Sequence, residues 1–215
     1  MLVVVLGLVP ALREPIEGVG TSFVALYVNV AILLAMLMAA LTAMPVVRAT
    51  YREQRILRRF ATTPAKPRDL LIAQYGIHGA AAIVGGALAV IVGRFAYGVA
   101  LPRYAVGFLL VFLLMLAACL GIGGLIGGRA RTAKFATTIG TVLLFPLMFT
   151  AGLWLPVPVM PGLLGDIVAL TPLGAGALAL GEAASGGWPD LKDLVVIAVW
   201  TAVLGTAATR FFRWE

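Results

Sequence analysis

The chain has 215 residues, of which 62% are hydrophobic and 12% are charged, with a formal net charge of +7. Soluble domains carry about twice that share of charge, so the composition excludes a soluble domain and predicts one all-α membrane domain, residues 1–215. The basic residues lie between apolar runs and not on a polar surface, which excludes nucleic acid as a partner. The single cysteine, Cys119, excludes an intrachain disulfide and a cysteine-based metal site.

Five apolar runs are long enough to cross about 30 Å of hydrocarbon, which takes roughly 20 helical residues. They cover residues 23–47, 70–93, 105–127, 137–155 and 194–212. Residues 1–9 would rise only about 14 Å as a helix and lack the cationic start of a signal peptide. We therefore expect about six spans, of which the first is short.

Lys and Arg are distributed unevenly between the two sides of these spans. Residues 48–68, 129–134 and 210–213 hold twelve of the sixteen cations, and Arg13, Arg94, Arg103 and Lys192 lie on the other side. Because cytoplasmic loops carry the excess of positive charge, the first group and the C-terminus are predicted to be cytoplasmic.

The basic segment TYREQRILRRFATTPAKPRDLL follows the first long run and spans residues 50–71. On a helical wheel four cations fall within about 60° of one another, broadly opposite an apolar sector. They are Arg48, just before the segment, and Arg52, Arg55 and Arg59 within it. The apolar residues are Ile56, Leu57 and Phe60. This pattern predicts an amphipathic cytoplasmic helix that ends at Pro64, with Pro67 in the first turn of the next helix.

An acid and an amide in this helix bear on what it contacts. Glu53 lies near the apolar sector and Gln54 follows it, whereas a helix that only lies on lipid would bury an uninterrupted apolar face. The pattern therefore favours a protein partner. The alternative is an ordinary positively charged loop that happens to be helical.

The sequence GIGGLIGG, residues 121–128, contains two overlapping G-x-x-x-G pairs. They are formed by Gly123 with Gly127 and by Gly124 with Gly128, and such pairs let another helix approach closely. The alternative is flexibility near a helix end in a chain with 25 glycines.

The segment LPVPVMPGLLGDIVALTPLGAGALALGEA, residues 155–183, is apolar enough to suggest another span. If it crossed, the acidic loop at 182–193 would face the cytoplasm, which reverses the charge pattern. Its prolines, Pro156, Pro158, Pro161 and Pro172, also break it into pieces too short to span. We expect a re-entrant hairpin of two half-helices on the outer side; a plain outer loop with one surface helix is the alternative.

Catalytic motifs are missing from the sequence, which has no phosphate-binding loop, no H-E-x-x-H and no G-x-S-x-G. The chain is therefore predicted not to be an enzyme. A proton relay needs several ionisable groups in series, so a hydrogen-bonded structural role is favoured for His78. Asn29 and Gln74 are predicted to make hydrogen bonds between helices.

Three stretches resemble the permease subunits of type-2 ABC exporters. YREQRILRRFATTPAKPRDLLIAQ resembles their coupling segment, R-E-x-x-T-L-R-R-L-x-x-T-P, with departures at Arg55 and Ile56. FPLMFTAGLWLPVPVMPGLLGDIVALTPLGAGALAL, residues 145–180, resembles their last re-entrant signature. RFFRWE resembles their usual C-terminus. The similarity is greatest to drug-export permeases of the daunorubicin-resistance kind, although these begin with a full first span where this chain has MLVVVLGLVP.

The resemblance implies six spans per subunit, two subunits per transporter in a bacterial plasma membrane, and a separate ATP-binding subunit docked on each coupling segment. ATP and Mg would be bound by that partner, with no cofactor in this chain. The implied ATPase contacts are Tyr51, Arg52, Glu53, Gln54, Ile56, Leu57, Arg58 and Phe60. The implied re-entrant and gate residues are Phe145, Pro146, Gly152, Pro156, Pro161 and Pro172.

The predicted function is export of a hydrophobic or amphipathic substrate, because no charged residue lies in the central stretches of the spans. The ATP-binding partner would drive transport. Two alternatives stay open. An ion-coupled secondary transporter would need ionisable groups inside the membrane, which are scarce here, and a membrane scaffold would have no transport role.

Overall fold

A helical run of 31 residues, Phe23–Glu53, begins the computed structural model, which describes residues 22–54 and 67–210. The run consists of α2 (Phe23–Leu37), the π-helix η2 (Met38–Ala43) and α3 (Met44–Glu53). Ser22 caps its start, because its hydroxyl accepts a hydrogen bond of 3.3 Å from the Ala25 N–H. Pro45 has no N–H to donate to the Leu41 carbonyl, and the helix widens to π geometry just before it.

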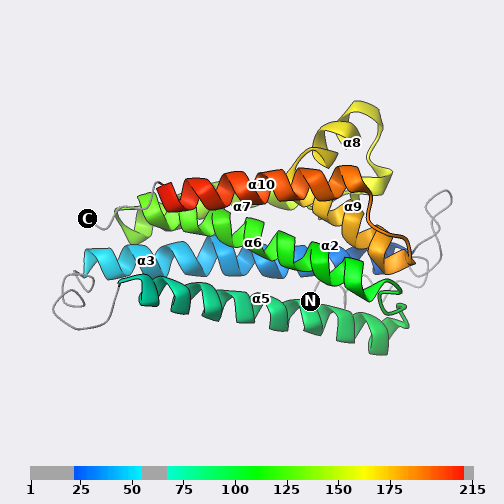
Figure 1. Cartoon of the computed structure of the whole chain (residues 1–215), viewed down its shortest axis with the longest axis horizontal. Helices are drawn as coiled ribbons and strands as arrows, with labels where there is room; N and C mark the ends of the chain where they lie inside the picture. Colours follow the sequence, from blue (N-terminus) through cyan, green and yellow to red (C-terminus); the bar gives the residue numbers. More distant parts are fainter. Residues whose placement is uncertain (1–21, 55–66, 211–215) are drawn as a thin grey trace.

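Four further long helices are each apolar enough to span a membrane; three of them pack against this run, and the last packs against the third span and the helix before it. They are α5 (Pro67–Tyr97), α6 (Ala105–Arg129), α7 (Ala133–Thr150) and α10 (Leu191–Arg210). In Figure 1 they lie roughly parallel to the first run, with the ends of α3, α6 and α10 at the left. We call this the basic end; its cations among the described residues are Arg48, Arg52, Arg68, Arg129, Arg131, Lys134 and Arg210.

A bent helix pair separates the last two spans. It is formed by α8 (Gly162–Ala169) and α9 (Pro172–Ser185), which meet at 94° after the short η3 (Val157–Val159). Leu170, at the bend, accepts a 3.0 Å hydrogen bond from Trp200 Nε1, about halfway along α10. Since α7 leads into the pair and α10 leaves it at the end opposite the basic end (Figure 1), the pair is the predicted re-entrant hairpin.

The interior of the bundle is centred on the first span. Ile32, Leu33, Met36 and Leu37 have no exposed surface, because α5, α6 and α9 all pack against α2. The outward faces carry large apolar side chains instead, such as Ile77, which is 66% exposed. Burial in the middle and apolar residues outside are what a bundle in lipid requires.

Five of the expected spans are confirmed, with boundaries shifted by a few residues. Pro67 does begin the following helix. The predicted helix from Arg48 to Pro64 is not continuous, because α3 ends at Glu53 and Gln54 leaves helical geometry. Residues 55–64 of that prediction lie outside the described residues. The expected short first span, residues 1–9, lies outside the described residues.

The orientation of the bundle can be tested by cysteine labelling. Ser185, the last residue of α9, is exposed, and Arg131 is exposed at the basic end. In a Cys119→Ser background we expect Ser185→Cys to react with an impermeant thiol reagent from outside the cell. Arg131→Cys should react only after the membrane is opened. Labelling of Ser185→Cys only from inside would show that the bundle is inverted or that the hairpin crosses.

Candidate functional site

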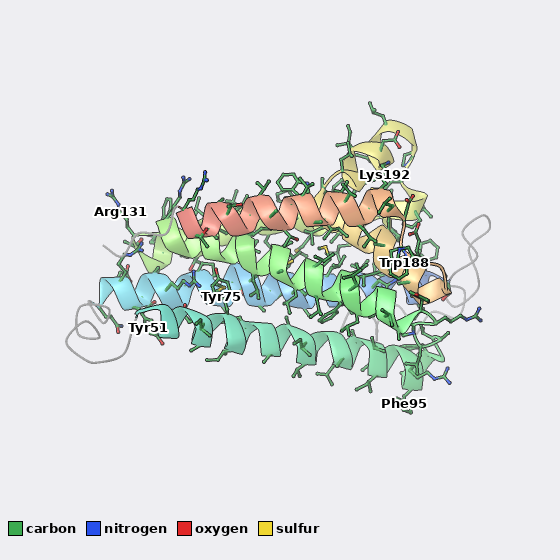
Figure 2. All side chains as sticks on the ribbon, viewed as in Figure 1. Tyr51, Tyr75, Phe95, Arg131, Trp188 and Lys192 are labelled. Carbon is green, nitrogen blue, oxygen red and sulfur yellow. The ribbon has the colours of Figure 1, made fainter. Side chains whose placement is uncertain are left out.

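Polar side chains from the last two turns of α3 reach the neighbouring helices at the basic end. Figure 2 shows Tyr51, Tyr75 and Arg131 at this end of the bundle. Arg48 points into the space between α5 and α6, Arg52 contacts the end of α6, and Glu53 contacts the start of α7. We call Arg48, Arg52, Glu53 and Gln74 the basic-end cluster.

Arg48 is buried, with 8% of its surface exposed. Its Nε donates a 2.8 Å hydrogen bond to the Gln74 Oε1, and its Nη1 lies 3.5 Å from the Gly124 carbonyl oxygen. The guanidinium carbon is 4.8 Å from the centre of the Tyr75 ring, a cation–π distance. The cation is thus held by an amide, a carbonyl and a ring.

The second terminal nitrogen of Arg48 and the Gln74 Nε2 are buried without a hydrogen-bond partner in the described part of the chain. A buried donor without an acceptor costs about 1–3 kcal/mol, and more when it is charged. Removing either side chain of the Arg48–Gln74 hydrogen bond is therefore expected to destabilise the bundle, because it leaves the other side chain with one more buried polar atom unpaired.

Glycines of α6 make room for the cluster. A Cβ on Gly124 would overlap the Tyr75 hydroxyl, and one on Gly127 would come within 2.9 Å of the Arg48 Cδ. A Cβ on Gly123 would overlap the Ala40 carbonyl oxygen in η2. Gly128 contributes its carbonyl oxygen, 3.4 Å from the Arg52 Nη2. These contacts put α6 against both the π-helix and the buried arginine.

Arg52 and Glu53 cap the end of α6 and the start of α7, which are joined by a short turn. Arg52 Nη1 donates a 2.7 Å hydrogen bond to the Ala130 carbonyl, just after α6. The Glu53 carboxylate accepts a 3.1 Å hydrogen bond from the Ala133 N–H, the first residue of α7. A cation at a helix C-terminus and an anion at an N-terminus both match the helix dipole. The last turn of α3 is therefore hydrogen-bonded to both ends of the α6–α7 turn.

Four of the eight expected ATPase contacts lie among the described residues. Tyr51 is half-buried and Gln54 is exposed, so both are accessible at the basic end, whereas Arg52 and Glu53 contact α6 and α7 within the chain. The remaining four, Ile56, Leu57, Arg58 and Phe60, lie outside the described residues.

The expected gate residues lie where α7 leads into the hairpin. Phe145 and Pro146 are exposed within α7, and Gly152 adopts φ +85°, which favours glycine. Pro156 precedes η3 and Pro161 precedes α8. Pro172 occupies the first turn of α9.

The predictions for three polar residues within the spans had different outcomes. Gln74 joins α5 to α3, which confirms the predicted hydrogen bond between helices. Asn29 was predicted to do the same, but it makes no hydrogen bond with the described residues and lines a cavity. His78 is half-exposed and also makes no hydrogen bond within residues 22–54 and 67–210, so the hydrogen-bonded role predicted for it is wrong there. The burial of Arg48 had no signal in the sequence beyond its place at the end of an apolar run.

Comparison with protein families gives a match over most of the chain. A family model described as ABC-2 family transporter protein matches residues 11–210, which is most of the chain. No curated protein matches the chain significantly.

Proposed function

We propose that this chain exports a hydrophobic or amphipathic substrate from a bacterial cell. The premise is that the chain belongs to the ABC-2 transporter family and is a membrane permease subunit. ATP would be bound and hydrolysed by a separate subunit that docks at the basic end, which is then cytoplasmic. Two permease subunits, identical or homologous, would form one transporter. The chain itself carries out no chemistry.

The basic-end cluster is the observation that best supports this proposal. The residues that the family resemblance assigns to the ATPase contact continue directly from α3, and α3 is bonded to α5, α6 and α7 through Arg48, Arg52 and Glu53. A displacement of the segment after Glu53 would therefore act on three spans at once. A loop without these contacts would not transmit it.

The mechanism requires two arrangements of the spans with different affinities for the substrate, because a ligand is moved only if its binding free energy differs between the states. ATP binding would close the partner dimer and carry the coupling segments with it. The hydrogen bonds of Arg52 and Glu53 would then move the α6–α7 turn together with α3.

The docking proposal is tested by removing the apolar residues of the coupling segment. We expect Leu57→Ala with Phe60→Ala to release the ATP-binding subunit, because truncating a desolvated apolar anchor typically costs about 2 kcal/mol or more. The measurement is co-purification of the tagged permease with its ATPase, followed by the mass of the complex, which is expected to contain two of each subunit.

The matched control is Leu163→Ala with Leu164→Ala, an exposed apolar pair on α8. It should leave co-purification unchanged. If the coupling pair can be removed with the ATPase still bound, the basic segment is only a topology signal. A complex containing one permease and one ATPase would contradict the paired arrangement.

A further inference from the structure

A cavity of about 470 Å³ lies inside one subunit, at the end opposite the basic end. Its walls come from the first turns of α2, the last part of α5, the loop before α6, and the end of α9. This volume falls within the range of sites for small organic ligands, about 300–1,000 Å³. None of the basic-end cluster lines it.

One wall of the cavity is fixed by hydrogen bonds between backbones. The Arg103 N–H donates to the Ala184 carbonyl at 3.3 Å, and the Tyr104 N–H donates to the Ala183 carbonyl at 3.1 Å. The Tyr104 ring also meets Trp188 edge to face, with centroids 5.2 Å apart. The loop before α6 is thus attached to the end of α9, and these contacts hold this wall of the cavity in place.

The lining is mainly apolar but contains one buried amide. Leu26, Val28, Phe108 and Leu178 contribute apolar surface. Asn29 is only 6% exposed and makes no hydrogen bond with the described residues. It faces Gly181, where an added Cβ would lie 3.9 Å from the Asn29 Nδ2. Asn29 lines the cavity, and its amide atoms are not fully buried. A ligand in the cavity can therefore supply the hydrogen-bond partner that the described residues do not.

The lining also carries one charge of each sign. Arg103 and Glu182 both line the cavity, yet no ion pair joins them in the described part of the chain. The Glu182 Oε2 accepts a 2.6 Å hydrogen bond from the Asp190 N–H, which fixes the carboxylate in place. A zwitterionic group could meet Arg103 with its anion and Glu182 with its cation.

We propose that this cavity binds an amphipathic molecule with an apolar body, a hydrogen-bonding group that meets Asn29, and a zwitterionic headgroup that lies between Arg103 and Glu182. As the substrate class of an exporter, this assignment rests on the proposed function. As a binding site it does not, because binding requires neither ATP nor a partner subunit.

The test uses a decylphosphocholine that carries a diazirine in its alkyl chain, added to the protein in nanodiscs of anionic lipid. Adducts formed on irradiation are mapped by mass spectrometry. We expect saturable adducts on α2 and α9 around Asn29 and Gly181, and competition by unmodified decylphosphocholine. Decyl sulfate and decyltrimethylammonium should compete at least tenfold more weakly, because each satisfies only one of the two charges.

Filling the cavity provides the decisive variant. Gly181→Leu places a side chain in it and should reduce the saturable adducts at least tenfold, as should Asn29→Leu. Gly76→Leu is the control, because a Cβ there meets no atom within 4 Å, and it should leave labelling unchanged. Asn29→Gln keeps an amide and should retain part of the labelling.

Two results would overturn the assignment. Labelling that does not saturate, or that is the same in Gly181→Leu, would mean that the probe only samples the lipid-facing surface. Equal competition by all three headgroups would remove the roles of Arg103 and Glu182. Since no ATPase is present, a negative result here leaves the docking proposal intact, and loss of docking leaves a positive result here intact.

Discussion

Gly123→Ala is expected to destabilise the bundle more than any other single methyl group on α6. The new Cβ would overlap the Ala40 carbonyl oxygen, an atom of the π-helix backbone that cannot rotate away. Overpacking that forces backbone to move typically costs about 1–3 kcal/mol. For a chain of this size that corresponds to a fall in Tm of about 2–12 °C. The measurement is loss of the monodisperse peak on heating in detergent.

The control for this prediction is Gly76→Ala on α5. A Cβ at Gly76 meets no atom within 4 Å, and alanine is the better helix former by about 1 kcal/mol, so no loss of stability is expected. Gly140→Ala should behave like Gly123→Ala, since its Cβ would lie 2.5 Å from the Leu41 carbonyl oxygen. Unchanged melting of both Gly123→Ala and Gly140→Ala would show that η2 does not pack against α6 and α7 as described.

The spans and the hairpin could be predicted because each depends on a property of its own residues. A membrane span needs about 20 apolar residues whatever surrounds it, and residues 105–127 read correctly as α6 (Ala105–Arg129) for that reason. The hairpin followed from its prolines and from the charge on its flanks. Neither inference required knowledge of a neighbouring helix.

The basic-end cluster depends on neighbours, and here the sequence was less informative. The spacing of Arg48 and Arg52 correctly places both on one side of a helix, but the wheel does not show that α5 and α6 cover that side. The predicted amphipathic helix therefore gave no indication that Arg48 is buried. The sequence also did not predict that α3 ends at Glu53, because no proline or glycine stands there.

The Asn29 amide in the cavity is a second example of a contact that depends on neighbouring helices. An asparagine inside a span usually bonds to another helix, and this expectation was reasonable for Asn29. The residue of α9 that lies across from it is Gly181, which has no side chain to offer. Only the packing of α2 against α9 reveals that mismatch.

The last prediction concerns the buried pair of Arg48 and Gln74, for which we expect a second substitution to restore stability that the first one removes. Gln74→Leu should destabilise the bundle by about 2 kcal/mol, because it leaves the Arg48 Nε without its acceptor inside the bundle. The double variant Arg48→Met with Gln74→Leu should be more stable than Gln74→Leu alone, since replacing both buried polar partners by apolar groups removes the unsatisfied charge. The two Tm values, measured in the same detergent, give the comparison.

Gln54→Leu supplies the matched control, because Gln54 is an exposed glutamine at the end of the same helical run. A surface substitution of this kind should change stability by less than about 0.5 kcal/mol. If the double variant loses as much stability as the two single variants added together, Arg48 and Gln74 act independently and the hydrogen bond between them has no energetic role. If instead the double variant is rescued in stability but no longer stimulates the ATPase, the buried arginine serves the coupling of α3 to α5 and α6, which is the role that the proposed function assigns to it.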